Sequence, residues 1–118
     1  LVLPVASLDA TCDFYTRVLG MTVVTFGSGR RALQFGQQKI NLHEAGHEFE
    51  PKAHRPTPGS ADLCFIAAGS MADVVDHMRA SDVPIVEGPV ARTGAVGPIT
   101  SVYLRDPDEN LIEVSVYE

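Results

Sequence analysis

The sequence predicts an α+β fold made of two tandem copies of one module, in which a strand is followed by a helix and three more strands (βαβββ). Residues 1–24 align without a gap with residues 63–86, and the apolar pattern agrees in both copies. A segment with three prolines, residues 50–60, separates the copies. A chain of 118 residues is short enough for one domain. We therefore expect a single domain over residues 1–118, with module 1 at 1–49, a linker at 50–60 and module 2 at 61–118.

Each copy begins with a short apolar strand, at residues 1–5 and 63–67, and a helix start signal follows. Ser7 and Ser70 are placed to cap the helices, and Asp73 completes a capping box with Ser70. Gly20 ends the first helix. The apolar residues at helical spacing are Leu8, Phe14 or Tyr15, Val18 and Leu19 in the first helix, and Met71, Val74, Val75 and Met78 in the second.

Three strands are expected after each helix, at residues 21–26, 31–35 and 39–43 in the first copy and at 84–86, 99–105 and 111–116 in the second. The prolines of the linker exclude a helix or a central strand there. Two curved sheets with outer helices would bury their apolar faces on the helix side. Their other faces would form a concave, partly polar surface.

Composition and charge exclude several classes of partner. The net charge is -6 and the Lys and Arg residues are scattered, which argues against nucleic-acid binding. No apolar run approaches the ~20 residues of a membrane span, and no leader opens the sequence. Cys12 and Cys64 are too few for a disulfide framework, so we expect buried free thiols in a soluble, cytoplasmic protein. Because the chain begins at Leu1, inside an apolar run, we also expect residues upstream of it.

Two local motifs sharpen the duplicated pattern. One is Phe14-Tyr15-x-x-x-Leu19-Gly20-Met21, and the other runs from Arg105-Asp106-Pro107 to Glu113. With the duplication, they resemble the vicinal oxygen chelate superfamily, which includes glyoxalase I, bleomycin resistance proteins and extradiol dioxygenases. The second motif is usually written DPDGN-x-x-E there, and Glu109 replaces its Gly. We expect Asn110 to take the left-handed conformation of this turn instead.

The resemblance implies curved mixed sheets around a metal-binding cavity, with the helices outside. It implies a divalent ion, Ni, Zn, Fe or Mn, held at the start of each module's first strand and the end of its last. The last-strand positions match His43 and Glu113, and the first-strand position of module 2 matches Asp62. The corresponding residue of module 1 would lie just before Leu1. Asp62 would bind the ion, bind a ligand water, or orient another ligand.

Strand alternation supports these positions, because successive side chains face opposite ways. Asn41 and His43 would face inward in the first copy, as would Leu111, Glu113 and Ser115 in the second. A rival register makes Glu44 the partner of Glu113. An ionised carboxylate in an apolar strand is costly unless it is paired or metal-bound, which favours Glu113 as a functional residue.

The remaining polar residues have weaker signals. His47, His54 and His77 are interpreted as surface residues, and Phe14 and Tyr15 as core. Residues 87–98 form a Gly-rich segment, long for a hairpin loop, and therefore a candidate lid. Its Arg92 would bind a substrate carboxylate or phosphate, or would simply be solvated. Tyr103 and Arg105 alternate with Val102 and Leu104 and would line the cavity.

The resemblance implies three competing functions. The favoured one is a glyoxalase-type lyase or isomerase, which acts on a small substrate with vicinal oxygens through a metal-stabilised enediolate, with Glu113 as ligand and base. The alternatives are an extradiol-type dioxygenase acting on a catechol, and a non-catalytic protein that binds a drug or other small molecule. Asp62 favours the first, because a dioxygenase usually has His at this position. We expect a small-molecule substrate and a homodimer, without nucleic-acid or membrane partners.

Overall fold

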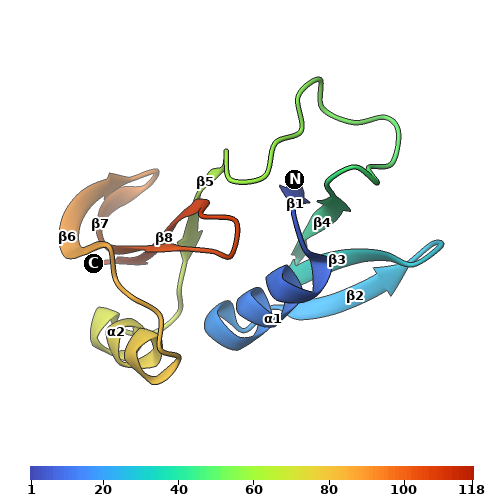
Figure 1. Cartoon of the computed structure of the whole chain (residues 1–118). Coiled ribbons are helices and arrows are strands. Elements are labelled where there is room, and N and C mark those ends of the chain that lie inside the picture. The colour runs from blue at the N-terminus through green and yellow to red at the C-terminus, as the bar shows by residue number, and fades with distance from the viewer. The chain divides into compact units, whose positions relative to one another are not determined.

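The computed structural model describes all residues from 1 to 118, and its elements follow the order βαβββ twice (Figure 1). This confirms the expected fold class. The elements are β1 (Val2–Val5), α1 (Leu8–Leu19), β2 (Thr22–Phe26), β3 (Arg30–Phe35), β4 (Gln38–Glu44), β5 (Asp62–Ile66), α2 (Met71–Ala80), β6 (Glu87–Gly94), β7 (Gly97–Arg105) and β8 (Leu111–Tyr117).

The contacts divide the chain into two compact units. The first consists of Leu1–Ala61 with Pro107–Glu109, and the second of Asp62–Asp106 with Asn110–Glu118. We call them the first and second modules.

The first module is a four-stranded mixed sheet in the order β1-β4-β3-β2, with β1 parallel to β4 and the other pairs antiparallel. Helix α1 contacts β2, β3 and β4. It buries Tyr15 and Val18, and Leu33, Ile40 and Leu42 are buried in the sheet. Ile40 and Leu42 alternate with Asn41 and His43, so these two polar side chains lie on the sheet face opposite the helix.

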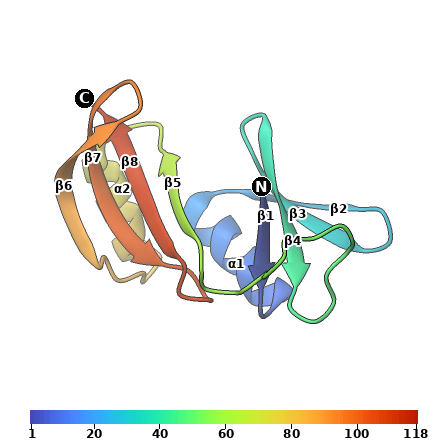
Figure 2. The ribbon, with the colours of Figure 1, turned by 90° about the horizontal axis from the view of Figure 1, so that it is seen from above.

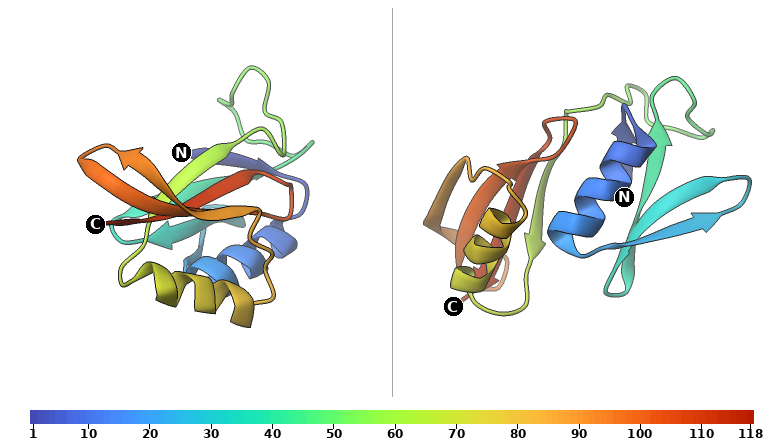
Figure 3. Two further views of the ribbon diagram at one scale, coloured as in Figure 1. Left: turned by 90° about the vertical axis from the view of Figure 1, so that its left-hand side faces the viewer. Right: turned by 60° about the horizontal axis from the view of Figure 1, so that its bottom comes forward.

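The second module repeats this plan. Its strands lie side by side in the order β5-β8-β7-β6, and β5 is parallel to β8 (Figure 2). Helix α2 runs along one face of the sheet and contacts β7 and β8 (Figure 3). The buried residues of β7 and β8 include Val102, Leu104, Ile112 and Val114. Glu113 and Tyr103 alternate with them and therefore lie on the open face, away from the helix.

The predicted caps at Ser7, Ser70 and Gly20 are confirmed. The Ser7 hydroxyl accepts a hydrogen bond from the amide of Ala10, and the Ser70 hydroxyl accepts one from that of Asp73. These bonds satisfy amide donors that have no partner within the helix. Gly20 has a left-handed φ of 68°, and its amide donates to the Thr16 carbonyl at the end of α1.

The prediction of a strand at 84–86 and a lid at 87–98 is wrong. Residues Glu87–Gly94 form the edge strand β6, which pairs with β7 through a short turn. Gly88 and Pro89 lie at a register shift in β6, and edge strands tolerate Pro and bulges. At Gly88 φ is +105°, and a Cβ would lie 2.5 Å from the Ser101 carbonyl oxygen. The Gly and Pro residues that predicted a loop therefore form a bulged strand.

The turn between β7 and β8 also differs from the prediction. Glu109, and not Asn110, has the left-handed conformation, with φ 67°. Asn110 is instead held by Asp106, whose carboxylate accepts hydrogen bonds from its backbone amide and from its side chain. Asn110 is buried and paired with Asp106, and the positive φ is adopted by the exposed Glu109 before it.

The free energy of unfolding should be about 1 kcal/mol higher for Glu109→Gly than for Glu109→Ala, because an L-residue is strained at this φ and glycine is not. The two variants lose the same carboxylate, so their difference isolates the backbone. Urea unfolding of both proteins measures it. An alanine variant as stable as the glycine variant would show that the turn carries no strain.

Neither helix has the length and apolar character needed to cross a membrane. Both cysteines are free, as expected, and Cys12 is buried. The expectation that both thiols are buried is wrong for Cys64, which is exposed on β5. Its strand neighbours Leu63 and Phe65 face the helix, so alternation turns the thiol to the open face. The exposed positions of His47, His54 and His77, and the buried positions of Phe14 and Tyr15, agree with the prediction.

Candidate functional site

The open face of the second module brings polar residues from four strands into one row. Cys64 pairs with Glu113, Glu113 with Tyr103, and Tyr103 with Glu87. Directly opposed residues on neighbouring strands have adjacent side chains. The sheet register therefore places a carboxylate at the centre of the row, between a thiol and a phenol.

Three residues predicted from the sequence form a hydrogen-bonded chain on this face. The Tyr103 hydroxyl donates to Oε1 of Glu113 at 2.6 Å, and Nε of Arg92 donates to the Tyr103 hydroxyl at 3.0 Å. The Arg92 guanidinium also lies 5.5 Å from the centroid of the Tyr103 ring and 3.7 Å from the Glu87 carboxylate. Arg92 is thus oriented by contacts with Tyr103 and Glu87, and Tyr103 links it to Glu113 by hydrogen bonds.

This environment favours the ionised form of Glu113. Burial acts to raise the pKa of Glu113, but hydrogen bonds from Tyr103, Cys64 and Ser101 and the charge of Arg92 together lower it below the usual value. The hydrogen bond to Glu113 in turn raises the pKa of Tyr103. At neutral pH the pair is therefore a carboxylate that accepts a hydrogen bond from a neutral phenol.

Cys64 has the opposite character. Burial and the neighbouring carboxylates of Glu113 and Asp62 raise the pKa of its thiol, and the hydrogen bond with Ser115 acts against this rise. A protonated thiol is a poor nucleophile. Cys64 therefore fits a hydrogen-bonding role beside Glu113 better than a covalent one.

Removing the Tyr103 hydroxyl should raise the pKa of Glu113. A carboxylate whose pKa is lowered in the folded state stabilises the fold above its unfolded-state pKa, and this contribution is lost as the pH falls through the folded-state value. In the metal-free Tyr103→Phe variant, this loss of stability should therefore begin at a higher pH than in the unsubstituted protein. Carboxyl carbon shifts in an NMR titration report the Glu113 pKa. Tyr117→Phe is the control, because its hydroxyl accepts a hydrogen bond from Val96 instead; equal effects of both substitutions would contradict this role for Tyr103.

Two buried serines support the row and were not predicted as a pair. The Ser101 and Ser115 hydroxyls are hydrogen-bonded at 2.7 Å, and the Cys64 Sγ lies 3.5 Å from the Ser115 hydroxyl. Both serines lie on the open face by alternation, which is the signal that could have found them. Asp62 lies at the start of β5 opposite Leu111 and is exposed.

The first module presents His43 on its open face. Its side chain is only 3% exposed, yet its ring nitrogens make no hydrogen bond to the protein, and its ring contacts the edge of Phe49 with centroids 5.8 Å apart. His43 is therefore suited to bind a ligand outside the protein's own hydrogen bonds.

The strand register changes the correspondence between the modules. Val2 pairs with Asn41, and its counterpart in the repeat, Cys64, pairs with Glu113. Asn41 and not His43 is thus the counterpart of Glu113, and the rival register through Glu44 is not observed either. This register concerns the correspondence between the repeats, and the assignment of His43 as a metal ligand stays a prediction. Asn41 lies on the same face as His43, and its Oδ1 is buried without a hydrogen-bond partner.

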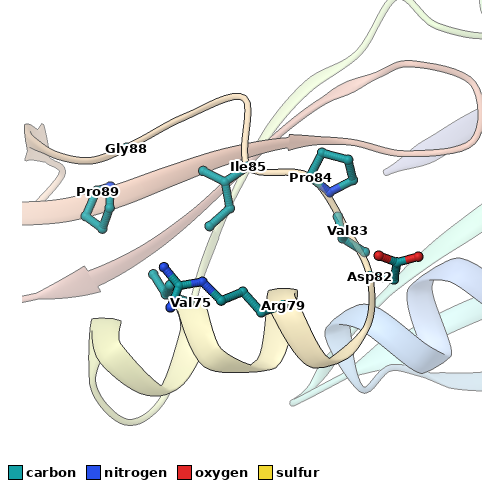
Figure 4. A pocket seen from close by; sticks show the side chains of 8 residues that line it. All are labelled: Val75, Arg79, Asp82, Val83, Pro84, Ile85, Gly88 and Pro89. Carbon is teal, nitrogen blue, oxygen red and sulfur yellow. The ribbon is translucent and has the colours of Figure 1, made fainter.

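A separate hollow lies on the helix side of the second module, between α2 and the segment that leads to β6 (Figure 4). Its volume is about 480 Å³. It contains none of the residues predicted for the site. It is lined by Val75, Arg79, Asp82, Val83, Pro84, Ile85, Gly88 and Pro89.

Comparison with known proteins establishes the family. Residues 1–114 match the model of the Glyoxalase/Bleomycin resistance protein/Dioxygenase superfamily. The chain belongs to this superfamily. The resemblance described from the two motifs is therefore confirmed.

Two relatives in this superfamily are similar over nearly the whole chain. Glyoxalase domain-containing protein RDO1 of Mycosarcoma maydis is 61% identical over 118 residues, which are 100% of this chain and 66% of that protein. Virulence protein STM3117 of Salmonella typhimurium is 59% identical over 117 residues, 99% of this chain and 81% of that protein. The chain thus spans just under two thirds of the length of RDO1.

Solved structures agree with this assignment. The crystal structure of STM3117 has a TM-score of 0.97 at 58% identity, and the match covers 99% of this chain and 93% of that one. A lactoylglutathione lyase from Agrobacterium tumefaciens has a TM-score of 0.74 at 24% identity, over 98% of this chain and 90% of that one. The second likeness shows the glyoxalase fold alone.

This glyoxalase-superfamily chain contains no group of three or more His, Cys, Asp or Glu side chains close enough to hold a metal ion. The open face of the second module supplies Glu113 and Asp62, and that of the first supplies His43.

Proposed function

We propose that the chain is a metal-dependent enzyme of the glyoxalase type, a lyase or isomerase acting on a small substrate with two neighbouring oxygens. The observation that carries the proposal is Glu113: an ionised carboxylate on the open face of a glyoxalase module, oriented by Tyr103 at 2.6 Å. A carboxylate placed in this way can take a proton from a carbon next to a carbonyl group.

The donor set fits a divalent ion. We propose that His43, Glu113 and Asp62 hold Ni, Zn, Fe or Mn, since imidazole and carboxylate together suit these metals. Two features support this set: the His43 ring has no protein hydrogen bond, and Glu113 is anionic at neutral pH. When bound, such an ion polarises the substrate oxygens and stabilises negative charge that develops on them.

The chain's own residues would divide the remaining work. Glu113 accepts the proton, and Tyr103 keeps its carboxylate oriented through the hydrogen bond to Oε1. Arg92 and Tyr103 are the proposed substrate-binding residues, because their polar groups lie on the same face as Glu113. Arg92 can also offer N–H donors to a substrate carboxylate or phosphate.

We further propose that the protein acts as a homodimer in the cytoplasm. Two-fold pairing is the commonest symmetry for small homo-oligomers, and the free thiols Cys12 and Cys64 suit a reducing compartment. Size-exclusion chromatography with light scattering tests the dimer.

Elemental analysis followed by three assays tests the function. Stoichiometric Ni or Zn, with loss of the hemithioacetal of methylglyoxal and glutathione, is the expected result. Fe(II) with oxygen uptake on catechols would replace the proposal with an extradiol dioxygenase. A protein that binds no metal and still retains an apolar drug would replace it with a binding protein.

A further inference from the structure

The open face of the first module carries a cluster of cations and aromatic rings that the proposed function does not use. Phe26 and Arg30 face each other across β2 and β3. The Arg30 guanidinium carbon lies 5.2 Å from the centroid of the Phe26 ring and 4.4 Å from that of Phe49. Lys39 Nζ lies 4.1 Å from the Phe26 centroid. We call Phe26, Arg30, Lys39 and Phe49 the cation–aromatic cluster.

The two cations of the cluster have no acidic partner. Four other cations of the chain, Arg17, Arg31, Lys52 and Arg92, each form an ion pair with a carboxylate. Arg30 and Lys39 form no ion pair, and their charged groups lie against aromatic rings. In a chain with a net charge of -6, two adjacent cations that avoid every carboxylate create a local positive potential.

The two carboxylates next to Phe49 in the sequence, Glu48 and Glu50, are both engaged, and Glu50 forms an ion pair with Lys52. Glu48 accepts a hydrogen bond from the Gly46 amide at 2.8 Å, and this bond is the largest cause that lowers the pKa of Glu48. Lys52 and His43 lower it further. Glu48 is therefore held by its own loop and does not neutralise Arg30.

The rings orient Arg30 for an external ligand. Phe26 and Phe49 both lie within stacking distance of the guanidinium, which limits its rotation and leaves its N–H edge for hydrogen bonding. A guanidinium edge matches two oxygens of a carboxylate or phosphate. Phe49 is 39% exposed, so the cluster is accessible from solvent.

A second feature points to a polar ligand on the same face. Asn41 lies between Lys39 and His43 along β4, on the same side of the sheet, and its buried Oδ1 has no donor within the protein. A ligand hydroxyl can supply that donor. The face thus offers cations for an oxyanion and an acceptor for a hydroxyl group.

We propose that Arg30 and Lys39 form an oxyanion-binding subsite, which takes the carboxylate or phosphate group of a small hydroxylated ligand. The identification of this ligand as the substrate rests on the function proposed above. The binding of the oxyanion does not, because it requires no metal and no residue of the second module.

An NMR titration of the metal-free chain with inorganic phosphate tests the subsite, and acetate in a second titration distinguishes a carboxylate site from a phosphate site. Ionic strength is held constant with chloride. Saturable shifts centred on Phe26, Arg30, Lys39 and Phe49 are expected. Arg30→Gln should weaken binding by about tenfold or more, because a hydrogen bond to a charged group is lost. Lys39→Gln should weaken it less, since a single ammonium gives no bidentate contact.

Arg55→Gln is the matched control, because it removes one positive charge from the exposed linker. Equal weakening by Arg55→Gln and Arg30→Gln, or shifts that do not saturate, would overturn the subsite. If Arg30→Gln loses the fold by circular dichroism, Lys39→Gln decides the question. Phosphate binding without metal-dependent turnover would overturn only the proposed function, and turnover without phosphate or acetate binding would overturn only the subsite.

Discussion

Glu113→Gln is expected to lower metal-dependent turnover by about 10²- to 10⁴-fold, the range for loss of a general base. The substitution keeps the shape of the side chain, so the Tyr103 hydroxyl can still donate to the remaining oxygen. It removes the negative charge that would bind the ion and accept the proton. Metal affinity should fall with turnover, and the melting temperature should change little.

The control is Glu109→Gln, which makes the same chemical change in the exposed turn before β8. Its turnover and metal content should match those of the parent. A Glu113→Gln protein that keeps full metal content and turnover would remove Glu113 from both roles. Isothermal titration with Zn²⁺ and steady-state kinetics measure the two effects.

His43→Gln is the second substitution with a large expected effect. We expect metal affinity to fall at least 10- to 100-fold, the loss that is typical of removing even an outer-shell partner. The amide side chain is a weaker metal ligand than imidazole and retains a polar group of similar size. Because His43 makes no hydrogen bond within the protein, its replacement leaves no protein donor or acceptor without a partner.

Three further variants separate the possible ligands of the first module. Glu44→Gln tests the rival register, and His54→Gln removes an exposed imidazole from the linker; both should bind metal like the parent. Asn41→Ala tests the residue that the strand register makes the counterpart of Glu113 in the repeat. A larger loss of metal affinity in Asn41→Ala than in His43→Gln would transfer the ligand role to Asn41.

The order of elements could be predicted because several local signals agree in each module. Caps at Ser7 and Ser70, helical spacing and strand alternation all indicate the same boundaries. Strand β6 could not be predicted, because Gly88 and Pro89 are also the residues that interrupt strands. Only the pairing with β7 shows that they form a bulge at an edge.

The candidate site was predictable only in part. Alternation correctly placed Tyr103 and Glu113 on one face, since it depends on neighbouring residues alone. The hydrogen bond from Arg92 to Tyr103 depends on the register of β6, which the sequence did not show. Phe49 lies in a loop without any periodic pattern, so its stacking on Arg30 could not be predicted.

Paramagnetic NMR tests most directly whether both modules bind one ion. Mn²⁺ is added to the isotope-labelled chain, and the broadening of amide signals is followed around His43 in β4 and around Glu113 in β8. If both modules bind one ion, both groups of signals should broaden with the same midpoint, and His43→Gln should weaken both together. Broadening confined to one module, or two different midpoints, would contradict a shared ion.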